Sequence, residues 1–172
     1  NEAQVYHDFV PAMIAATGAH PEGAHCWIIS DHRAMRRYGL GPIGPFPARL
    51  GPYLKAGYLK VGRTPTDLAK AMNLPPEAVQ DSIARFNCFA KAGKDSDFHR
   101  GESVYDRGNG DANHSPNPTL GALEQSPFYA IRMIPGDIGC FLGLRVDSSA
   151  RVLDGSESAI PGLWAEIGRA HV

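Results

Sequence analysis

The stretch TPTDLAKAMNLPPEAVQDSIARFNCFAKAG, Thr64 to Gly93, contains the clearest secondary-structure signals of the chain. Thr64 suits the N-cap of a first helix, because Pro65 follows at the first helical position and Asp67 lies in the first turn. After two prolines, apolar residues recur at helical spacing and stop at a glycine, which predicts a second, amphipathic helix over residues 77–93. The apolar stripe of this helix consists of Val79, Ile83, Phe86 and Ala90. We expect the two helices to pack on the core of a domain.

Short apolar runs on either side of the helix pair predict strands. These runs are HCWIISD (25–31), GYLKVG (57–62), PFYAIRMIPG (127–136), GLRVD (143–147) and ARVLD (150–154), with turns at Ser148-Ser149 and Asp154-Gly155. Helical spacing over residues 1–18 predicts a helix that Pro11 either kinks or starts. The basic segment 32–38 predicts another helix. The runs 39–52 and 94–120 predict loops, and a loop as long as the second is more often functional than idle.

Length and composition predict one packed domain, since 43% of the 172 residues are hydrophobic and 20% are charged. Lysine and arginine number 17 against 18 acidic residues, so the chain carries no field that would gather nucleic acid or an anionic membrane. Cys26, Cys88 and Cys140 are expected to be buried thiols in a reducing compartment, the cytoplasm, with peripheral membrane association left open. No apolar run is long enough for a transmembrane span, and both ends are expected to be cut from a longer protein.

Gly39, Gly41 and Gly44 have the G-x-G-x-x-G spacing of a dinucleotide-binding loop, but the context of such a loop is missing. A functional loop follows a strand and opens a helix, because the helix N-terminus and free backbone amides hold the pyrophosphate. Here a basic segment precedes the glycines, Pro42 removes an amide, and two further prolines stop a helix. The sequence therefore predicts a stiff crossover loop.

The helix pair also has the outline of a helix-turn-helix, so a DNA-binding module is an alternative. Its second helix carries Glu77 and Asp81 near the start, where acidic side chains would repel phosphate. The sequence therefore predicts packing helices and no nucleic-acid partner.

Histidine and cysteine do not predict a metal site or a nucleophile. Two groups lie close in the sequence: His20, His25 and Cys26, and His99, Asp111 and His114. Neither has the paired spacing of a metal site, and no G-x-S-x-G elbow is present, so no metal and no hydrolase chemistry are predicted.

Four stretches together resemble the 3-ketosteroid Δ1-dehydrogenases, close relatives of the fumarate reductase flavoproteins. They are NEAQVYHDFV (1–10), CWIISD (26–31), FHRGESVYDRGNGDANHSPNPTLGALEQSPFYAIRMIPGDIG (98–139) and GLRVDSSARVLDGSESAIPGLWA (143–165). The third is the most specific, because it places Y-x-R, G-D, P-N-P, P-F-Y-A and P-G-D in one order. The resemblance implies an α+β fragment of a two-domain flavoprotein. Residues 1–138 would be part of the substrate-binding (cap) domain, and residues 139–165 the start of the return into the FAD-binding domain.

The same resemblance implies FAD as cofactor, with its main binding segments outside these residues, so the chain alone is expected to be inactive. It implies that a C1–C2 double bond is introduced into a hydrophobic ketone, a 3-ketosteroid, by proton abstraction by a tyrosine and hydride transfer to flavin N5. The N-E-[S/A]-x-x-Y pattern assigns the base to Tyr6, because a phenolate with a lowered pKa can take a proton beside a carbonyl. The sequence does not identify the electron acceptor.

Further site residues follow from the same resemblance. Candidates for lining the steroid site are Tyr38, Trp27, Ile43, Phe46 and Leu50, with plain core packing as the alternative for each. The run GDIGCFLGL (136–144) assigns Gly139, Gly143 and Leu144 to the flavin. Leu142 stands where many relatives have a second glycine, which weakens that assignment.

The final residues, EIGRAHV (166–172), depart from the family pattern, and we expect a non-native tail translated from a sequencing adapter. Two alternative functions remain open. One is a fumarate reductase-like flavoprotein acting on another unsaturated acid or ketone, although a dicarboxylate would need several convergent Arg and His side chains. The other is a non-catalytic helix-pair binding module.

Overall fold

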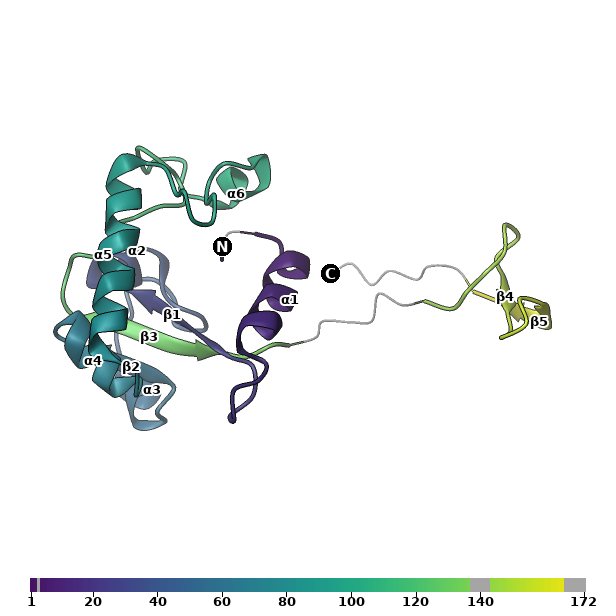
Figure 1. Cartoon of the computed structure of the whole chain (residues 1–172), viewed down its shortest axis with the longest axis horizontal. Helices are drawn as coiled ribbons and strands as arrows, with labels where there is room; N and C mark the ends of the chain where they lie inside the picture. Colours follow the sequence, from purple (N-terminus) through teal and green to yellow (C-terminus); the bar gives the residue numbers. More distant parts are fainter. Residues whose placement is uncertain (3, 137–142, 166–172) are drawn as a thin grey trace. The chain divides into compact units, whose positions relative to one another are not determined.

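The computed structural model describes residues 1–2, 4–136 and 143–165, which belong to two units (Figure 1). Unit 1 comprises Asn1–Pro135, and unit 2 begins at Gly136. Each unit is described by itself.

Unit 1 is built on an antiparallel three-stranded sheet in the order β1-β3-β2 (Figure 1). The strands are β1 (Cys26–Ser30), β2 (Leu59–Gly62) and β3 (Phe128–Met133). In the register, Ile131 of β3 lies opposite Ile28 on one side and Leu59 on the other. β3, the central strand of this sheet, is thus the last of the three in the sequence. All three strands fall within apolar runs predicted to be strands, which confirms those predictions.

The helices α4 (Pro65–Ala71) and α5 (Pro76–Ala92) cover one face of this sheet. Phe128 and Ala130 of β3 point to this face, because alternate residues of a strand share a face. They meet the apolar residues of the helices, which are Leu68, Ala69, Met72, Val79 and Ile83. Helix α5 ends at Gly93 with φ +70°, in the left-handed conformation that favours glycine. The predicted helix pair is confirmed as two helices packed on a core.

The opposite face of the sheet is covered by α2 (His32–Tyr38), α3 (Gly51–Lys55) and the loop between them. Tyr129 and Ile131, the alternate residues of β3, pack here with Met35 of α2 and with Ile43. Gly39 has φ +80°, and a Cβ there would lie 2.1 Å from the carbonyl oxygen of Ile43. This glycine therefore serves a tight backbone approach in a crossover loop.

Helix α1 (Tyr6–Thr17) confirms the helix predicted over residues 1–18. Pro11 lies in its interior, which excludes the alternative that the helix begins at that proline. Helix α6 (Val104–Asn109) lies inside the segment predicted as loop, and the Ser103 side chain accepts a hydrogen bond from the Asp106 amide at its start. A six-residue helix buries too few residues to show an apolar period, which explains why the sequence pattern did not reveal it.

The described part of unit 2 contains a hairpin of β4 (Arg151–Leu153) and β5 (Ala159–Trp164). β4 confirms one predicted strand, but the predicted strand 143–147 contributes only the bridge of Val146 to Val152. β5 was not predicted, because Pro161 and Gly162 are residues that weaken strands. The described residues combine helices with antiparallel sheets, which confirms the α+β class.

The cysteine prediction is wrong for Cys88, which is exposed on α5. Its position lies away from the stripe of Val79 and Ile83 that faces the core, so the helical period turns it outward. Cys26 is half-buried, and Cys140 lies outside the described residues. In the part of the chain that the structure describes, no helix is both long enough and apolar enough to span a membrane.

Candidate active site

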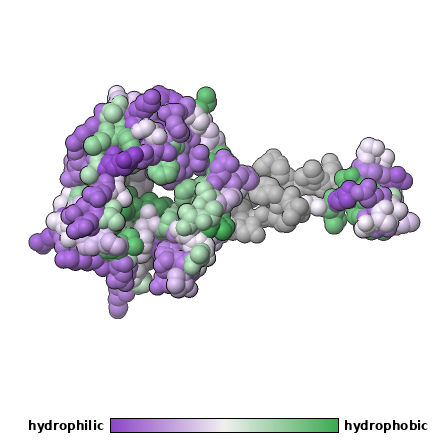
Figure 2. All heavy atoms as spheres, viewed as in Figure 1, coloured by the Kyte–Doolittle hydropathy of each residue, from purple (hydrophilic) through white to green (hydrophobic). Residues whose placement is uncertain are grey.

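Unit 1 is hollowed by two neighbouring cavities, and Figure 2 shows a hollow with hydrophobic residues inside and hydrophilic residues around it. The larger has a volume of about 750 Å³. We call it the tyrosine cavity; Tyr6, Arg33, Arg37, Tyr38, Tyr105 and Asp111 are among its lining residues. The smaller, the apolar cavity, measures about 540 Å³ and is lined by residues that include Phe9, Met13, Trp27, Ile83 and Phe89. Glu2, Gln4 and Phe86 line both.

Tyr6 is the first residue of α1, and this position brings its ring to the tyrosine cavity. The ring stacks on His7 with 4.2 Å between ring centroids, and 46% of the residue is exposed. A phenol in this position can reach a molecule in the cavity. The segment before α1 supplies the rest of this wall through Glu2 and Gln4.

Tyr38, the last residue of α2, lines the same cavity, and its hydroxyl is hydrogen-bonded to a carboxylate. The Tyr38 hydroxyl donates a hydrogen bond to Asp111 Oδ2 over 2.6 Å, and Arg37 Nη2 lies 2.7 Å from the same oxygen. Burial and the hydrogen bond to Asp111 raise the pKa of Tyr38 above its usual value. The hydrogen bonds from Tyr38 and from the Asn113 amide, together with Arg37, lower the pKa of Asp111. At neutral pH this pair therefore consists of a neutral phenol and a carboxylate.

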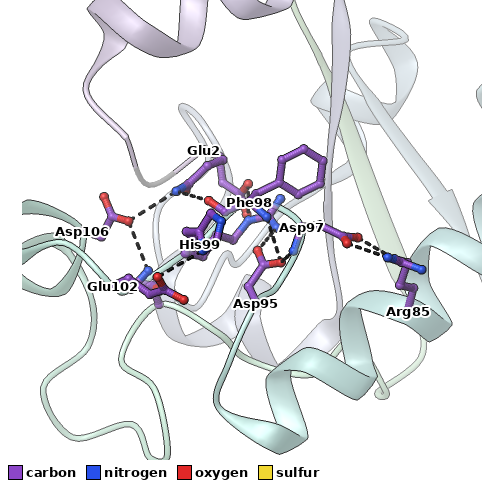
Figure 3. A network of polar contacts seen from close by, with 12 residues as sticks. Glu2, Arg85, Asp95, Asp97, Phe98, His99, Glu102 and Asp106 are labelled. Atoms are coloured by element: carbon purple, nitrogen blue, oxygen red, sulfur yellow. Dashed lines mark hydrogen bonds and ion pairs between the residues drawn. The ribbon is translucent and has the colours of Figure 1, made fainter.

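A network of polar contacts that includes Glu2, Asp95 and Phe98 ties the N-terminal segment to the loop before α6 (Figure 3). Arg100 pairs with Glu2 at 2.7 Å and with the fully buried Asp95. Its guanidinium also lies over the ring of Phe98, 4.9 Å from the centroid. The Asn1 side chain donates to the Phe98 carbonyl and to Asp106. These contacts hold the segment that carries Tyr6 against the wall of both cavities.

The structure separates the residues that the sequence assigns to the substrate. Tyr6 and Tyr38 line the tyrosine cavity together, whereas Trp27 lines the apolar cavity. Ile43 is buried in the core beneath α2, at 2% exposure, and Leu50 packs against the same cluster. Phe46 is exposed, with the Arg36 guanidinium 5.1 Å from its ring centroid, and it is not among the lining residues of either cavity.

Asp111 and Arg33 are site residues that the sequence reasoning did not identify as such. Asp111 appeared there only as a possible metal ligand, although it lies 73 positions from the tyrosine that it binds. Arg33 lines the tyrosine cavity and donates one hydrogen bond to the Ala122 carbonyl over 3.1 Å. No local spacing signals either contact, because the partners come from distant segments.

Of the first histidine group, His20 and His25 come together, but with Glu22 in place of Cys26; the ligand atoms of these three residues all lie within 4.8 Å of one another. These groups already have partners. His25 Nδ1 lies 2.8 Å from the Gly23 carbonyl oxygen, and Glu22 pairs with Arg132 at 2.9 Å. Of the second group, Asp111 and His114 line the tyrosine cavity.

The residues that the resemblance assigns to the flavin do not form a binding cradle where the structure describes them. Gly143 and Leu144 are exposed, and a Cβ added at Gly143 would meet no atom within 4 Å. These two residues therefore lie on an open surface and do not enclose a ligand. Gly139 lies outside the described residues. Within the described residues, then, the assigned positions do not form a complete flavin site.

Comparison with known proteins places the chain among flavoproteins. Residues 1–170 match the model of the FAD binding domain family, and the chain belongs to this family. FAD, the cofactor expected from the sequence, is therefore confirmed for the family to which the chain belongs.

Three relatives show which members of the family the chain resembles. The chain is 39% identical over 165 residues to 4-oxocyclohex-2-ene-1-carboxylate 5-dehydrogenase of Sinomonas cyclohexanicum, which covers 96% of this chain and 28% of that protein. It is 42% identical over 147 residues to 3-oxosteroid 1-dehydrogenase of Mycolicibacterium smegmatis, covering 84% of this chain and 25% of that protein.

The third is the crystal structure of 3-ketosteroid Δ1-dehydrogenase from Sterolibacterium denitrificans in complex with 1,4-androstadiene-3,17-dione. It matches with a TM-score of 0.87 and 36% identity, over 95% of this chain and 30% of that chain. These matches confirm the resemblance to the 3-ketosteroid Δ1-dehydrogenases. The chain spans less than a third of the length of each of these relatives.

Proposed function

We propose that this chain is the substrate-binding part of an FAD-dependent dehydrogenase that removes hydrogen from two neighbouring ring carbons of a 3-ketosteroid. The observation that carries the proposal is the position of Tyr6 on the tyrosine cavity, in a unit whose fold matches an enzyme crystallised with a steroid dienone. A cavity of about 750 Å³ lies within the usual range for small-molecule sites.

Tyr6 is the proton acceptor in this proposal. Hydrogen beside a ketone is acidic enough for a phenolate to remove it when the carbonyl is polarised. FAD, when bound, supplies the acceptor for the hydride that leaves the adjacent carbon. The second tyrosine, Tyr38, is a poor candidate for the base, because its hydroxyl donates a hydrogen bond to Asp111 and its raised pKa keeps the phenol protonated. Tyr38 instead forms a wall of the cavity.

The proposal is tested by Tyr6→Phe in the complete gene product. This change removes only the hydroxyl, so turnover of a 3-ketosteroid is expected to fall by roughly 10²–10⁴, the usual contribution of a general base. Flavin absorbance of the purified enzyme should stay the same. Tyr58→Phe is the matched control, because Tyr58 packs beside Tyr53 outside both cavities. Turnover of Tyr6→Phe within a few-fold of the wild type would refute the role of Tyr6.

A second candidate substrate is a smaller ring ketone that carries a carboxylate. The relative from Sinomonas cyclohexanicum is named for such a compound, and Arg33 offers a matching cation. Within the described part of the chain, Arg33 forms no ion pair, whereas Arg37 on the same cavity is paired with Asp111. A guanidinium without a carboxylate partner can bind the carboxylate of a substrate.

Arg33→Gln separates the two substrate classes. If an oxocyclohexane carboxylate is bound through Arg33, the change should lower its kcat/KM by about tenfold or more, the scale of a hydrogen bond between charged groups. The kcat/KM for a neutral 3-ketosteroid should change little, and Arg36→Gln serves as a control because Arg36 lies over Phe46. Equal effects on both substrates would show that Arg33 does not select between them.

A further inference from the structure

The carboxylate of Asp111 accepts hydrogen bonds from two directions. From α2 it receives the Tyr38 hydroxyl at 2.6 Å and the Arg37 guanidinium at 2.7 Å. From its own loop it receives the Asn113 amide at 2.9 Å. The Asp111 side chain is only 15% exposed, although Arg37 is largely exposed. One side chain therefore joins the end of α2 to a segment far along the chain.

The segment that Asp111 fastens is residues 110–120, which we call the Asp111 loop. The loop is closed on itself: the Asp111 amide donates to the Pro118 carbonyl over 2.9 Å, and His114 Nε2 lies 2.7 Å from the Leu120 carbonyl oxygen. At its rear, the buried Asn117 donates to the carbonyls of Gly93 and Arg100. The loop is thus closed on itself, and Asn117 and Asp111 attach it to two different parts of unit 1.

The Asp111 loop also forms a wall of the tyrosine cavity. Gly110, Asp111, His114, Pro118 and Thr119 all line that cavity, as does Tyr6. The attachment to α2 therefore determines where this wall lies. A shift of the loop would therefore change the shape of the cavity and with it the fit of a substrate.

We propose that Asp111 is a positioning residue: by holding Tyr38 and Arg37 it fixes the Asp111 loop as a wall of the tyrosine cavity and thereby sets how tightly a substrate binds. This inference rests on the proposed function for its effect on catalysis. The attachment itself is a property of the fold and can be measured without a substrate.

The experiment uses the complete gene product with Asp111→Ala, Tyr38→Phe and the double variant. Asp111→Ala and Tyr38→Phe are each expected to raise KM roughly tenfold, the scale of one hydrogen bond to a charged group, with kcat within roughly twofold. The double variant should be little worse than Asp111→Ala alone, because both changes break the same contact. Amide hydrogen exchange in residues 111–120 should be faster in Asp111→Ala than in the wild type.

Glu102→Ala is the control, since Glu102 pairs with His99 in the same long segment but lines neither cavity. It should leave KM and exchange in the Asp111 loop unchanged. A fall in kcat with unchanged KM, or fully additive effects in the double variant, would overturn the positioning role. If the wild type turned over no ketone, the proposed function would fail. Exchange would then decide the inference alone, and unchanged protection of residues 111–120 in Asp111→Ala would overturn it.

Discussion

Asp95 lies in the loop after α5 and has no exposed surface. Its hydrogen-bond partners therefore determine whether its carboxyl group is ionised. Burial by itself would raise its pKa. The hydrogen bond from Arg100 and the amides of Phe98 and Asp97 outweigh burial, so the pKa of Asp95 lies below its ordinary value of 3.8. The residue is therefore ionised at neutral pH and holds Arg100, which in turn pairs with Glu2.

The shift in the pKa of Asp95 predicts an acid-dependent contribution to stability. A carboxyl whose pKa is lowered by folding stabilises the protein fully above its unfolded pKa and loses this effect as pH falls through the folded pKa. Asp95→Asn should thus lower the free energy of unfolding by about 1–3 kcal/mol at pH 7. The difference between wild type and variant should shrink as pH falls below about 4.

Thermal unfolding followed at pH 7, 5, 4 and 3 would measure this difference. Asp97→Asn is the control in the same loop, because Asp97 forms an ion pair with the exposed Arg85 and should matter much less. A constant difference between wild type and Asp95→Asn at all four pH values would show that the charge of Asp95 does not stabilise the fold.

At the scale of elements, the start of α4 is determined by residues that are close in the sequence. Thr64 Oγ1 accepts from the Asp67 amide at 3.1 Å, and Asp67 Oδ2 accepts from the Thr64 amide at 3.1 Å. The sequence predicted part of this capping box, since it identified Thr64 as the N-cap and placed Asp67 in the first turn. The helix that follows buries Leu68 completely against the sheet.

Loss of this cap is expected to destabilise unit 1. Thr64→Ala should lower the free energy of unfolding by about 1 kcal/mol, because the Asp67 amide loses its acceptor. Thr64→Ser keeps the oxygen and should recover most of that loss. Urea denaturation of the three proteins would test this prediction, and equal destabilisation by both substitutions would exclude the hydrogen bond as the cause.

At the scale of the whole molecule, both apolar clusters belong to unit 1. One lies between the sheet and α4–α5 and the other between the sheet and α2, and every residue in them precedes Gly136. A unit with its own core should fold without the rest of the chain.

A chain shortened to residues 1–135 is therefore expected to unfold cooperatively. Its thermal unfolding midpoint should lie within roughly 4 °C of that of the whole chain, which corresponds to a change in the free energy of unfolding below about 1 kcal/mol. Calorimetry on both chains would measure it. The absence of a cooperative transition in the shortened chain would show that unit 1 depends on residues after Pro135.

The sequence by itself determined the parts of this protein that depend on near neighbours. Helix caps, the apolar stripe of α5 and the β1, β2 and β3 runs could be predicted, because capping and side-chain periodicity act within a few residues. The resemblance to the 3-ketosteroid Δ1-dehydrogenases came from ordered short motifs and was confirmed by the comparisons. The short helix α6 and the strand β5 were missed, since one has too few turns and the other contains Pro161 and Gly162.

Only the tertiary structure decided how the candidate site is assembled. β3 enters the sheet between β1 and β2, and this pairing joins segments from both ends of unit 1. It brings Asp111 to Tyr38 and places both on one cavity with Tyr6, while Trp27 lies on the other cavity and Ile43 in the core. No local pattern encodes such contacts, because they form between residues whose distance is fixed by packing and not by the chain between them.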